Sequence, residues 1–271
     1  MNDTEGFLSI REEQLAELEV MKGLHAYCSK HGLKYILGYG SLLGAIRHHG
    51  FIPWDNDMDV FMPRKDMEKL IELEKTEPIA PNIKLFHMSM NENYHYPIVR
   101  ACNMNTTVGN RELRNQIEGI GLWVDVFPMD GLIKSKLFFQ KPLIIYYFKM
   151  LNATMYVSET ESNAKKKFRR IVSKLFPNRK HKYERHLTSV CSWSRYEDAK
   201  KVSVICEEGS DMRWGMDRED VDNPVLTPFE DAEFYVPKNA DKYLTQQYGN
   251  YMQLPREEDR QTHLLYTKYR N

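Results

Sequence analysis

Three aspartates at alternate positions, Asp55, Asp57 and Asp59, are the residues of this sequence with the clearest chemical potential. In an extended strand, side chains at alternate positions project from the same face, so the three carboxylates would gather if the strand reaches back to residue 55. Like charges brought together are costly unless a cation neutralises them. Because hard oxygen ligands favour magnesium, manganese or calcium over zinc, this spacing predicts a divalent-cation site.

A glycine-rich turn lies shortly before these aspartates. Residues 38–41, with the sequence GYGS, interrupt the regular pattern and are expected to open a short helix that continues to Ile46. Free backbone N–H groups and the helix dipole favour a phosphate at such a helix start, and glycine lets the backbone approach the anion closely. Gly40 and Ser41 are therefore predicted to bind a phosphate. Arg47, at the end of this helix, is a candidate to hold the phosphate of a departing nucleotide.

Asp125 is a candidate for a third carboxylate. It lies in the strand-like run of residues 121–127, where its neighbours are apolar. A charge embedded in such a run needs a partner, and a metal ion is one candidate; the alternative is a strand-end aspartate that caps the next turn. An anion cradle followed by paired carboxylates is what metal-assisted phosphoryl transfer requires. Asp130 precedes Gly131 and is interpreted as a turn residue.

A calcium loop is the main competing chemical interpretation of the aspartate run. The spacing of the three aspartates imitates the first half of an EF-hand, and Asp66 falls at the twelfth position. The sixth position is Val60, however, where the sharp turn of that loop needs glycine. A solvated acidic loop without function is also disfavoured, because residues 54, 58 and 60 are apolar.

The elements that must position these residues follow from the hydrophobic periodicity. A helix is expected over 11–31, with Gly32 as its C-terminal cap. A second helix is expected over 64–75, and Arg100 ends an apolar strand from which it can face the site. Strands are predicted at residues 35–37, 58–62, 83–86, 98–102 and 122–127. This mixture favours an α/β (α+β) domain with a short mixed sheet and flanking helices over a doubly wound sheet.

The pattern after residue 131 is helical to about residue 210. An apolar stretch over 137–151 contains Lys141, Pro142 and Lys149; it is too short and too charged to span a bilayer. A buried helix is the favoured interpretation, and a membrane-surface patch is the alternative. Segment 165–186 holds ten lysines and arginines against the single acid Glu184. Such a segment is either a solvated helix face or a contact for anionic lipid or glycan.

Composition narrows the class of protein. Lysine plus arginine and aspartate plus glutamate both number 38, so the formal net charge is zero, which disfavours a dedicated nucleic-acid binder. The four cysteines are scattered without zinc or disulfide spacing and are typical of free thiols in a reducing compartment. The acidic N-terminus is followed by no apolar run, so no signal peptide is predicted and a cytoplasmic location is expected.

Together these motifs resemble the LicD family, which includes phosphorylcholine transferases and, more distantly, fukutin-related sugar-phosphate transferases. The likeness is densest over residues 33–64 and resumes over 123–131. A third set of matching positions covers residues 229–231, 235–237, 243–244, 248–252, 254–255, Arg260 and His263. Residues 132–215 contain none of the motifs on which this likeness rests.

The resemblance implies a nucleotidyltransferase-like fold with a Gly-Ser helix turn and an Asp-x-Asp strand. It places a metal pair on Asp57 and Asp59, with Asp125 as the third ligand, and implies Mg²⁺, with Mn²⁺ as the alternative. The family usually has aspartate where this chain has Asn56. Alternation turns Asn56 away from the pair, so metal binding is expected to survive, but the role of Asp55 is left open. Substrate-binding candidates are Asp55, Arg100, Arg260 and His263.

The implied reaction moves phosphocholine, or a similar alcohol phosphate, from CDP-choline or a related CDP-alcohol. The implied acceptor is a sugar hydroxyl of a cell-surface glycan, a lipid-linked glycan or a teichoic acid precursor. Residues 1–131 would form the catalytic core, 132–215 a basic helical extension, and 216–271 a segment that completes the substrate site. Contact of segment 165–186 with the inner face of the cell membrane is the alternative to a solvated helix face. The alternatives are a nucleotidyltransferase that releases pyrophosphate from a nucleoside triphosphate, and an inactive metal-binding adaptor.

Overall fold

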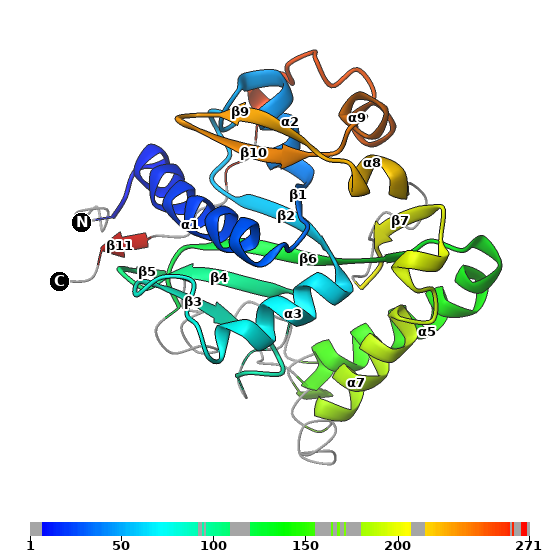
Figure 1. Cartoon of the computed structure of the whole chain (residues 1–271). Helices are drawn as coiled ribbons and strands as arrows, with labels where there is room; N and C mark the ends of the chain where they lie inside the picture. Colours follow the sequence, from blue (N-terminus) through cyan, green and yellow to red (C-terminus); the bar gives the residue numbers. More distant parts are fainter. Residues whose placement is uncertain are drawn as a thin grey trace.

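A mixed β-sheet forms the centre of the molecule (Figure 1). The computed structural model describes residues 7–91, 94, 96–108, 120–154, 164, 167–168, 171, 180–206, 215–260, 262 and 267–269. The sheet order is β1-β2-β6-β4-β3, and β7 and β8 extend it beyond β6. Its strands are β1 (Ile36–Leu37), β2 (Met58–Pro63), β3 (Ile83–Phe86), β4 (Val99–Asn103), β6 (Trp123–Gly131), β7 (Lys201–Val204) and β8 (Met216–Asp217).

The pairing of β2 with β6 is parallel, whereas the other pairs described in this sheet are antiparallel. A parallel pair needs a long crossover connection. Here the chain between β2 and β6 provides helix α3 (Arg64–Glu74) and the strands β3, β4 and β5 (Thr106–Val108). The predicted α/β class with a short mixed sheet is confirmed.

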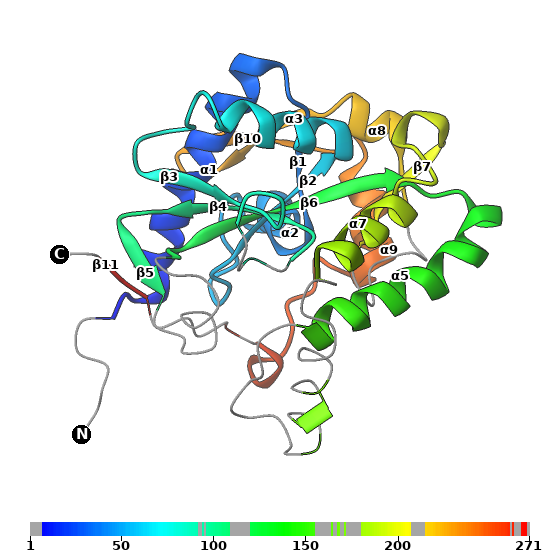
Figure 2. The ribbon, with the colours of Figure 1, turned by 90° about the horizontal axis from the view of Figure 1, so that it is seen from below.

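Helix α1 (Ile10–His31) is the long N-terminal helix that the periodicity predicts. Ser9 and Glu12 form a capping box at its start, and Gly32 ends it in the left-handed conformation at φ 62°. Helices α1 and α3 lie on the same side of the sheet, as the views in Figures 1 and 2 agree. The chain between β1 and β2 forms the short helix α2 (Tyr39–His48).

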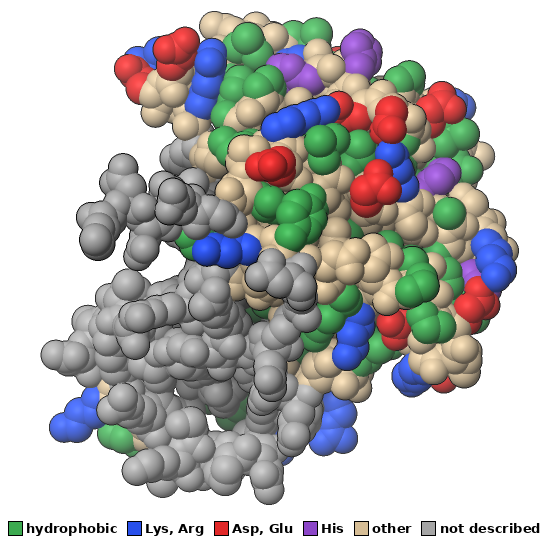
Figure 3. Space-filling view, turned by 90° about the vertical axis from the view of Figure 1, so that its left-hand side faces the viewer, with side chains coloured by type: hydrophobic (Ala, Val, Ile, Leu, Met, Phe, Trp, Pro, Cys, Tyr) green, Lys and Arg blue, Asp and Glu red, His purple; other side chains and the backbone are tan. Residues whose placement is uncertain are grey.

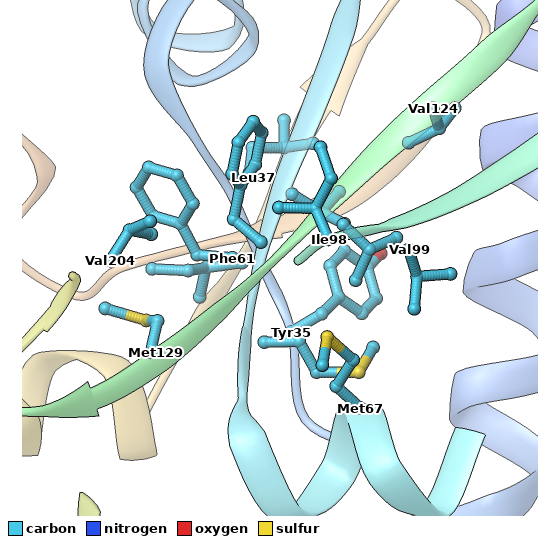
Figure 4. Packing of buried hydrophobic residues seen from close by; sticks show 14 of the residues in the cluster. Tyr35, Leu37, Phe61, Met67, Ile98, Val99, Val124, Met129 and Val204 are labelled. Carbon is cyan, nitrogen blue, oxygen red and sulfur yellow. The ribbon is translucent and has the colours of Figure 1, made fainter. Parts of the chain in front are cut away.

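The hydrophobic core lies on both sides of this sheet. Figure 4 shows side chains from β2, β4, β6, β7 and α3 meeting there. Tyr35, Leu37 and Val124 are almost fully buried in this cluster. Burial of apolar side chains at about 25 cal/mol per Å² is the main stabilising contribution in such a core.

Two helices pack together beyond the C-terminal end of β6: α5 (Lys134–Thr154) and α7 (Lys180–Cys191) (Figures 1 and 2). Gln140 on α5 donates to the carbonyl oxygen of Val190 at 2.9 Å. The helix predicted over 137–151 is confirmed, but the expectation that it is buried is wrong. Phe138 and Phe139 are 77% and 66% exposed.

The chain after α7 contains strands as well as helices. The helical interpretation to about residue 210 is wrong at 201–204, where β7 pairs with the far end of β6. The 3-10 helix η1 (Tyr196–Asp198) precedes β7, and α8 (Arg218–Asp222) follows β8. Most of the basic segment 165–186 lies outside the described residues, so its predicted membrane contact stays a prediction.

The C-terminal region packs against both ends of the N-terminal half. Strands β9 (Val225–Phe229) and β10 (Ala232–Val236) form a hairpin, followed by α9 (Ala240–Tyr248) and the 3-10 helix η2 (Glu257–Asp259). The final strand β11 (Thr267–Tyr269) pairs with β5. At the hairpin turn, Glu230 binds the Arg11 guanidinium with both oxygens, at 3.0 and 2.6 Å. The division into three segments is not tested by these contacts and stays a prediction.

The face that carries the start of α1 has a mixed charge. Figure 3 shows acidic and basic side chains interspersed there among hydrophobic ones. Two ion pairs illustrate this alternation: Arg11 with Glu230, and Lys22 with Asp231. Among the helices of the described residues, none is both long enough and apolar enough to cross a membrane.

Candidate active site

The register of three neighbouring strands brings Asp59, Asp125 and Arg100 together. Asp59 on β2 is the partner of Asp125 on the parallel strand β6, and Asp125 is the partner of Arg100 on the antiparallel strand β4. Register partners project from the same face of a sheet. The structure therefore brings the aspartate of the Asp-x-Asp run next to the predicted third carboxylate, with the predicted arginine beside them.

Asp125 is held by two hydrogen-bond donors. Arg100 Nε donates to Asp125 Oδ1 at 2.8 Å, and the indole Nε1 of Trp123 donates to Oδ2 at 3.1 Å. Burial raises the pKa of Asp125, and the charge and hydrogen bond of Arg100 oppose that shift. The guanidinium also lies over the rings of Tyr96 and Trp123, at 4.6 and 4.1 Å from their centroids. Arg100 is thus fixed by an ion pair on one side and by aromatic faces on the other.

The other two aspartates of the run precede the strand rather than lying in it. Strand β2 begins at Met58, as predicted, so the condition that it reach back to residue 55 is not met. Asp55 instead follows a turn in which its backbone N–H donates to the carbonyl oxygen of Ile52 at 2.9 Å. Its carboxyl is nevertheless hydrogen-bonded to that of Asp57, and burial together with the Asp57 charge raises the pKa of Asp55 to about 8. Asp57 in turn acts electrostatically on Asp125.

The predicted phosphate cradle is the N-terminus of α2. Gly38 is its N-cap and makes no side-chain capping bond. The Ser41 hydroxyl accepts the backbone N–H of Asp59 at 2.8 Å, which ties the helix start to the acidic strand. A Cβ at Gly40 would lie 2.6 Å from Asp55 Oδ2. Gly40 and Ser41 therefore lie directly beside the aspartates, as predicted, and the glycine leaves room for the Asp55 carboxyl near the positive end of the helix dipole.

Arg47 lies at the opposite end of the same helix. Seven residues separate it from Gly40, about 10 Å along the helix axis. Its Nη1 donates to the carbonyl oxygen of Tyr251 at 2.6 Å, and its Nε donates to Nε2 of His48 at 2.9 Å. The structure does not bring Arg47 to the phosphate cradle; it joins the end of α2 to the C-terminal region.

Arg260 approaches the site from the C-terminal region. Its guanidinium lies over the ring of Trp54, 4.5 Å from the centroid, and Thr262 Oγ1 donates to the Trp54 carbonyl oxygen at 2.7 Å. Trp54 directly precedes Asp55, so Arg260 lies over the loop that carries the acidic run. His263 lies outside the described residues.

Two buried glutamates on α1 belong to this site although sequence reasoning misses them. Glu13 and Glu17 are 4% and 1% exposed. Burial and the charges of Asp57, Glu13, Asp125 and Asp59 raise the pKa of Glu17 well above its usual range. One of its oxygens, Oε2, is buried without a hydrogen-bond partner among the described residues. The sequence does hold a signal: positions 13, 17, 20, 21 and 24 share one helix face, so the acids continue the buried stripe of Val20, Met21 and Leu24.

Asn56 contacts this glutamate pair. Its Nδ2 donates to Glu13 Oε2 at 2.5 Å, and the side chain is fully buried. The amide thus supplies a donor to Glu13, whereas the family's usual aspartate would place a second carboxyl there. The prediction that residue 56 does not join the Asp57–Asp59 pair agrees with this contact.

The acidic residues fit a divalent cation in their chemistry. The charges of Asp57, Asp59 and Asp125 each act unfavourably on the buried Glu17 carboxylate, and a bound cation relieves such repulsion. Within the described residues, however, no three His, Cys, Asp or Glu side chains form a ready-made ligand group. Both Asp125 oxygens are already hydrogen-bonded. The metal set of Asp57, Asp59 and Asp125 accordingly stays a prediction.

The interpretation of Asp130 as a turn residue is wrong. Asp130 lies in β6, is 2% exposed, and accepts two hydrogen bonds from Arg64, each of 2.6 Å. Arg64 begins α3 at the end of β2. The ion pair of Arg64 and Asp130 therefore joins β2 and β6 at the end opposite to Asp59 and Asp125. This structural contact explains why Asp130 is buried.

Comparisons with known proteins identify the family of this chain. The chain is 27% identical over 97% of its length to a lipopolysaccharide cholinephosphotransferase LicD of Haemophilus influenzae, and covers 98% of that protein. It is also 26% identical to an uncharacterised protein of Rickettsia typhi, over 51% of this chain and 40% of the relative. A model of the LicD/FKTN/FKRP nucleotidyltransferase domain matches residues 32–190, which contain Asp57, Asp59, Asp125 and Arg100. The chain therefore belongs to the LicD family.

Proposed function

We propose that this protein transfers phosphocholine, or a similar alcohol phosphate, from a CDP-alcohol to a sugar hydroxyl of a cell-surface glycan precursor. The observation that carries the proposal is the register of Asp59 opposite Asp125. It occurs in a chain that aligns over almost its full length with a lipopolysaccharide cholinephosphotransferase. Family membership and the helix start beside the aspartates support the same reaction.

The reaction is a displacement at phosphorus. The oxygen of the sugar hydroxyl bonds to the phosphorus that carries choline, and the bond from that phosphorus to the bridging oxygen of the diphosphate breaks. The products are the phosphocholine ester and cytidine monophosphate. The hydroxyl proton passes to a carboxylate, for which Asp125 is our candidate, because its raised pKa suits proton acceptance. Positioning and charge neutralisation are expected to supply most of the acceleration.

The other residues of the site would bind the metal ion, orient the phosphate and position Asp125. Asp57 and Asp59 would hold Mg²⁺ or Mn²⁺, which would neutralise the diphosphate charge. The first N–H groups of α2, at Gly40 and Ser41, would orient a phosphate. Arg100 holds Asp125 in place through its Nε.

A product assay tests the reaction. CDP-choline is incubated with Mg²⁺, with and without a glycan acceptor, and cytidine monophosphate is measured. We expect acceptor-dependent release of the monophosphate. Release of pyrophosphate from a nucleoside triphosphate would favour a nucleotidyltransferase instead, and binding of Mg²⁺ and nucleotide without turnover would favour an inactive adaptor. Running lipopolysaccharide-type and teichoic-acid-type acceptors in parallel separates the two glycan classes.

Substitutions at the aspartates test the assignment of the site. Asp57→Asn and Asp59→Asn are expected to lower turnover by about 1000-fold or more, because charge stabilisation at the reacting phosphate is lost. Glu72→Gln is a matched control, since its carboxylate is 73% exposed and pairs with Lys75. Circular dichroism and the unfolding midpoint report whether each variant is folded. Near-normal turnover in folded Asp57→Asn or Asp59→Asn would remove these residues from the site.

A further inference from the structure

The outer face of α5 carries exposed aromatic side chains. Phe138, Phe139 and Tyr146 are 77%, 66% and 52% exposed. The opposite face is used for packing: Gln140, which binds the end of α7, is 1% exposed, and Ile144 is fully buried. Contiguous exposed apolar surface on a folded protein commonly marks an interaction site.

Lysines surround these aromatic residues. Helix α5 contains four lysines and no aspartate or glutamate along its 21 residues. Lys136 Nζ donates to the backbone carbonyl oxygen of Trp193 at 2.6 Å, which places Trp193, itself 44% exposed, beside the start of the helix. The nearby acid Asp198 is already bound by Arg195 at 2.9 Å. The lysines are Lys134, Lys136, Lys141 and Lys149.

This chemistry favours a lipid surface over a second copy of the chain. A two-fold symmetric dimer through this face would oppose the same lysines from both copies, and like charges across an interface are unfavourable. An anionic bilayer supplies the opposite charge, and aromatic side chains partition to the bilayer interface. The helix, about 32 Å long, does not have the apolar character of a membrane span.

We propose that α5 docks the protein on the surface of an anionic lipid bilayer, lying in the interface with Phe138, Phe139 and Tyr146 inserted and its lysines at the headgroups. This inference goes beyond the transfer reaction and does not depend on it. It also differs from a contact through segment 165–186, since the residues that carry it belong to α5. Docking would hold the enzyme where lipid-linked acceptors are found.

Vesicle co-sedimentation of the full chain tests the proposal. Vesicles of phosphatidylcholine with phosphatidylglycerol are compared with phosphatidylcholine alone. We expect binding to the anionic vesicles that weakens as salt is raised. The double variant F138A/F139A should bind about tenfold more weakly or worse, because the inserted apolar area is lost. K134Q/K141Q should lose about tenfold through the charge contribution.

Controls separate insertion from unfolding and from self-association. V225A/L226A removes apolar side chains of β9 that are 48% and 44% exposed, and it should bind like the parent chain. The fluorescence emission of Phe138→Trp should shift to the blue on anionic vesicles. Equal vesicle binding by folded F138A/F139A, or no binding at all, would overturn the proposal. A dimer in sedimentation that F138A/F139A abolishes, without vesicle binding, would assign the face to a second copy of the chain.

Discussion

The Asp125 carboxylate can bind either Arg100 or a metal ion. Arg100 and Trp123 occupy both of its oxygens, and Arg100 is itself fixed over aromatic rings. A buried charge that loses its partner is costly, so a metal could replace these donors only by supplying comparable stabilisation. In the proposed reaction, Asp57 and Asp59 would therefore be the primary metal ligands, and Asp125 would accept a proton.

Replacing Asn56 with the family's usual aspartate gives a test at the same scale. Asn56→Asp would put a carboxyl 2.5 Å from Glu13, without the amide donor. We expect a loss of about 2 kcal/mol in the free energy of unfolding at neutral pH. The repulsion exists only while both carboxylates are charged, so the deficit in the free energy of unfolding should be smaller in acid than at neutral pH.

Denaturant unfolding across about pH 4 to 8 measures this effect. Asn105→Asp is the matched control, because position 105 is exposed and should tolerate the same change within about 0.5 kcal/mol. Equal stability of Asn56→Asp and the parent at neutral pH would contradict the contact between Asn56 and Glu13.

The candidate carboxylates can be found in the sequence, because they depend on spacing. Two-residue alternation indicates Asp55, Asp57 and Asp59, an embedded charge indicates Asp125, and only the family resemblance narrows the run to Asp57 and Asp59. Glu13 and Glu17 escape such reasoning because acids on a helix are usually solvated, and burial depends on what packs against the helix. The partners of Asp130 and Arg47 are hidden for the same reason, since each is contacted by a residue distant in the sequence.

At the scale of elements, the position of α2 depends on its close contact with the turn that leads to the aspartates. A Cβ at Gly44 would lie 2.5 Å from the backbone carbonyl oxygen of Gly50. Gly44→Ala should therefore destabilise the protein by about 2 kcal/mol or more and lower activity. This is opposite to the gain of roughly 1 kcal/mol that alanine gives over glycine inside a free helix.

Gly32→Ala provides the comparison. Gly32 has a positive φ of 62°, lies at the end of α1, and has no atom within 4 Å of the point where alanine would add its methyl group. We expect this change to cost about 1 kcal/mol through backbone strain, with turnover unchanged. Thermal unfolding and the product assay distinguish the two variants. Loss of activity in Gly32→Ala, or none in Gly44→Ala, would contradict the contact of α2 with Gly50.

Element boundaries are predictable where one face of an element is buried and the other is not. Helix α1 and strand β3 have such patterns, and both have nearly the predicted bounds. Strand β2 is buried at all six positions, yet its start at Met58 matches the prediction, because the apolar run itself marks the strand. The short strand β7 was missed because its position is set by pairing with β6. The exposure of α5 was missed because its apolar residues lie on both faces.

At the scale of the whole molecule, His87 makes the free energy of unfolding depend on pH. It is 8% exposed, and burial together with the charge of Arg64 lowers the pKa of His87 to about 4. Because the unfolded chain binds this proton more readily, with a pKa near about 6.5, the contribution of His87 is fully present above about pH 6.5 and is lost as pH falls toward 4. The change amounts to roughly 3 kcal/mol.

Unfolding free energies at about pH 7 and about pH 4.5 check this dependence. In His87→Asn the drop between the two pH values should be smaller than in the parent chain. Asparagine keeps an acceptor for the Ser89 backbone N–H, which donates to His87 Nδ1 at 3.2 Å. His49→Asn is the control, since that residue caps α2 and is exposed. An equal pH dependence in His87→Asn and the parent would show that His87 is not the sensing group.

The parallel pairing of β2 with β6 has a consequence for biosynthesis. Asp59 leaves the ribosome long before Asp125, and α3, β3, β4 and β5 are made in between. A nascent chain that stops short of residue 123 therefore lacks the strand that brings the third carboxyl and its arginine partner together. The acidic centre can be assembled only after nearly half of the chain has been made, so a shorter polypeptide cannot present the complete set of groups to a nucleotide.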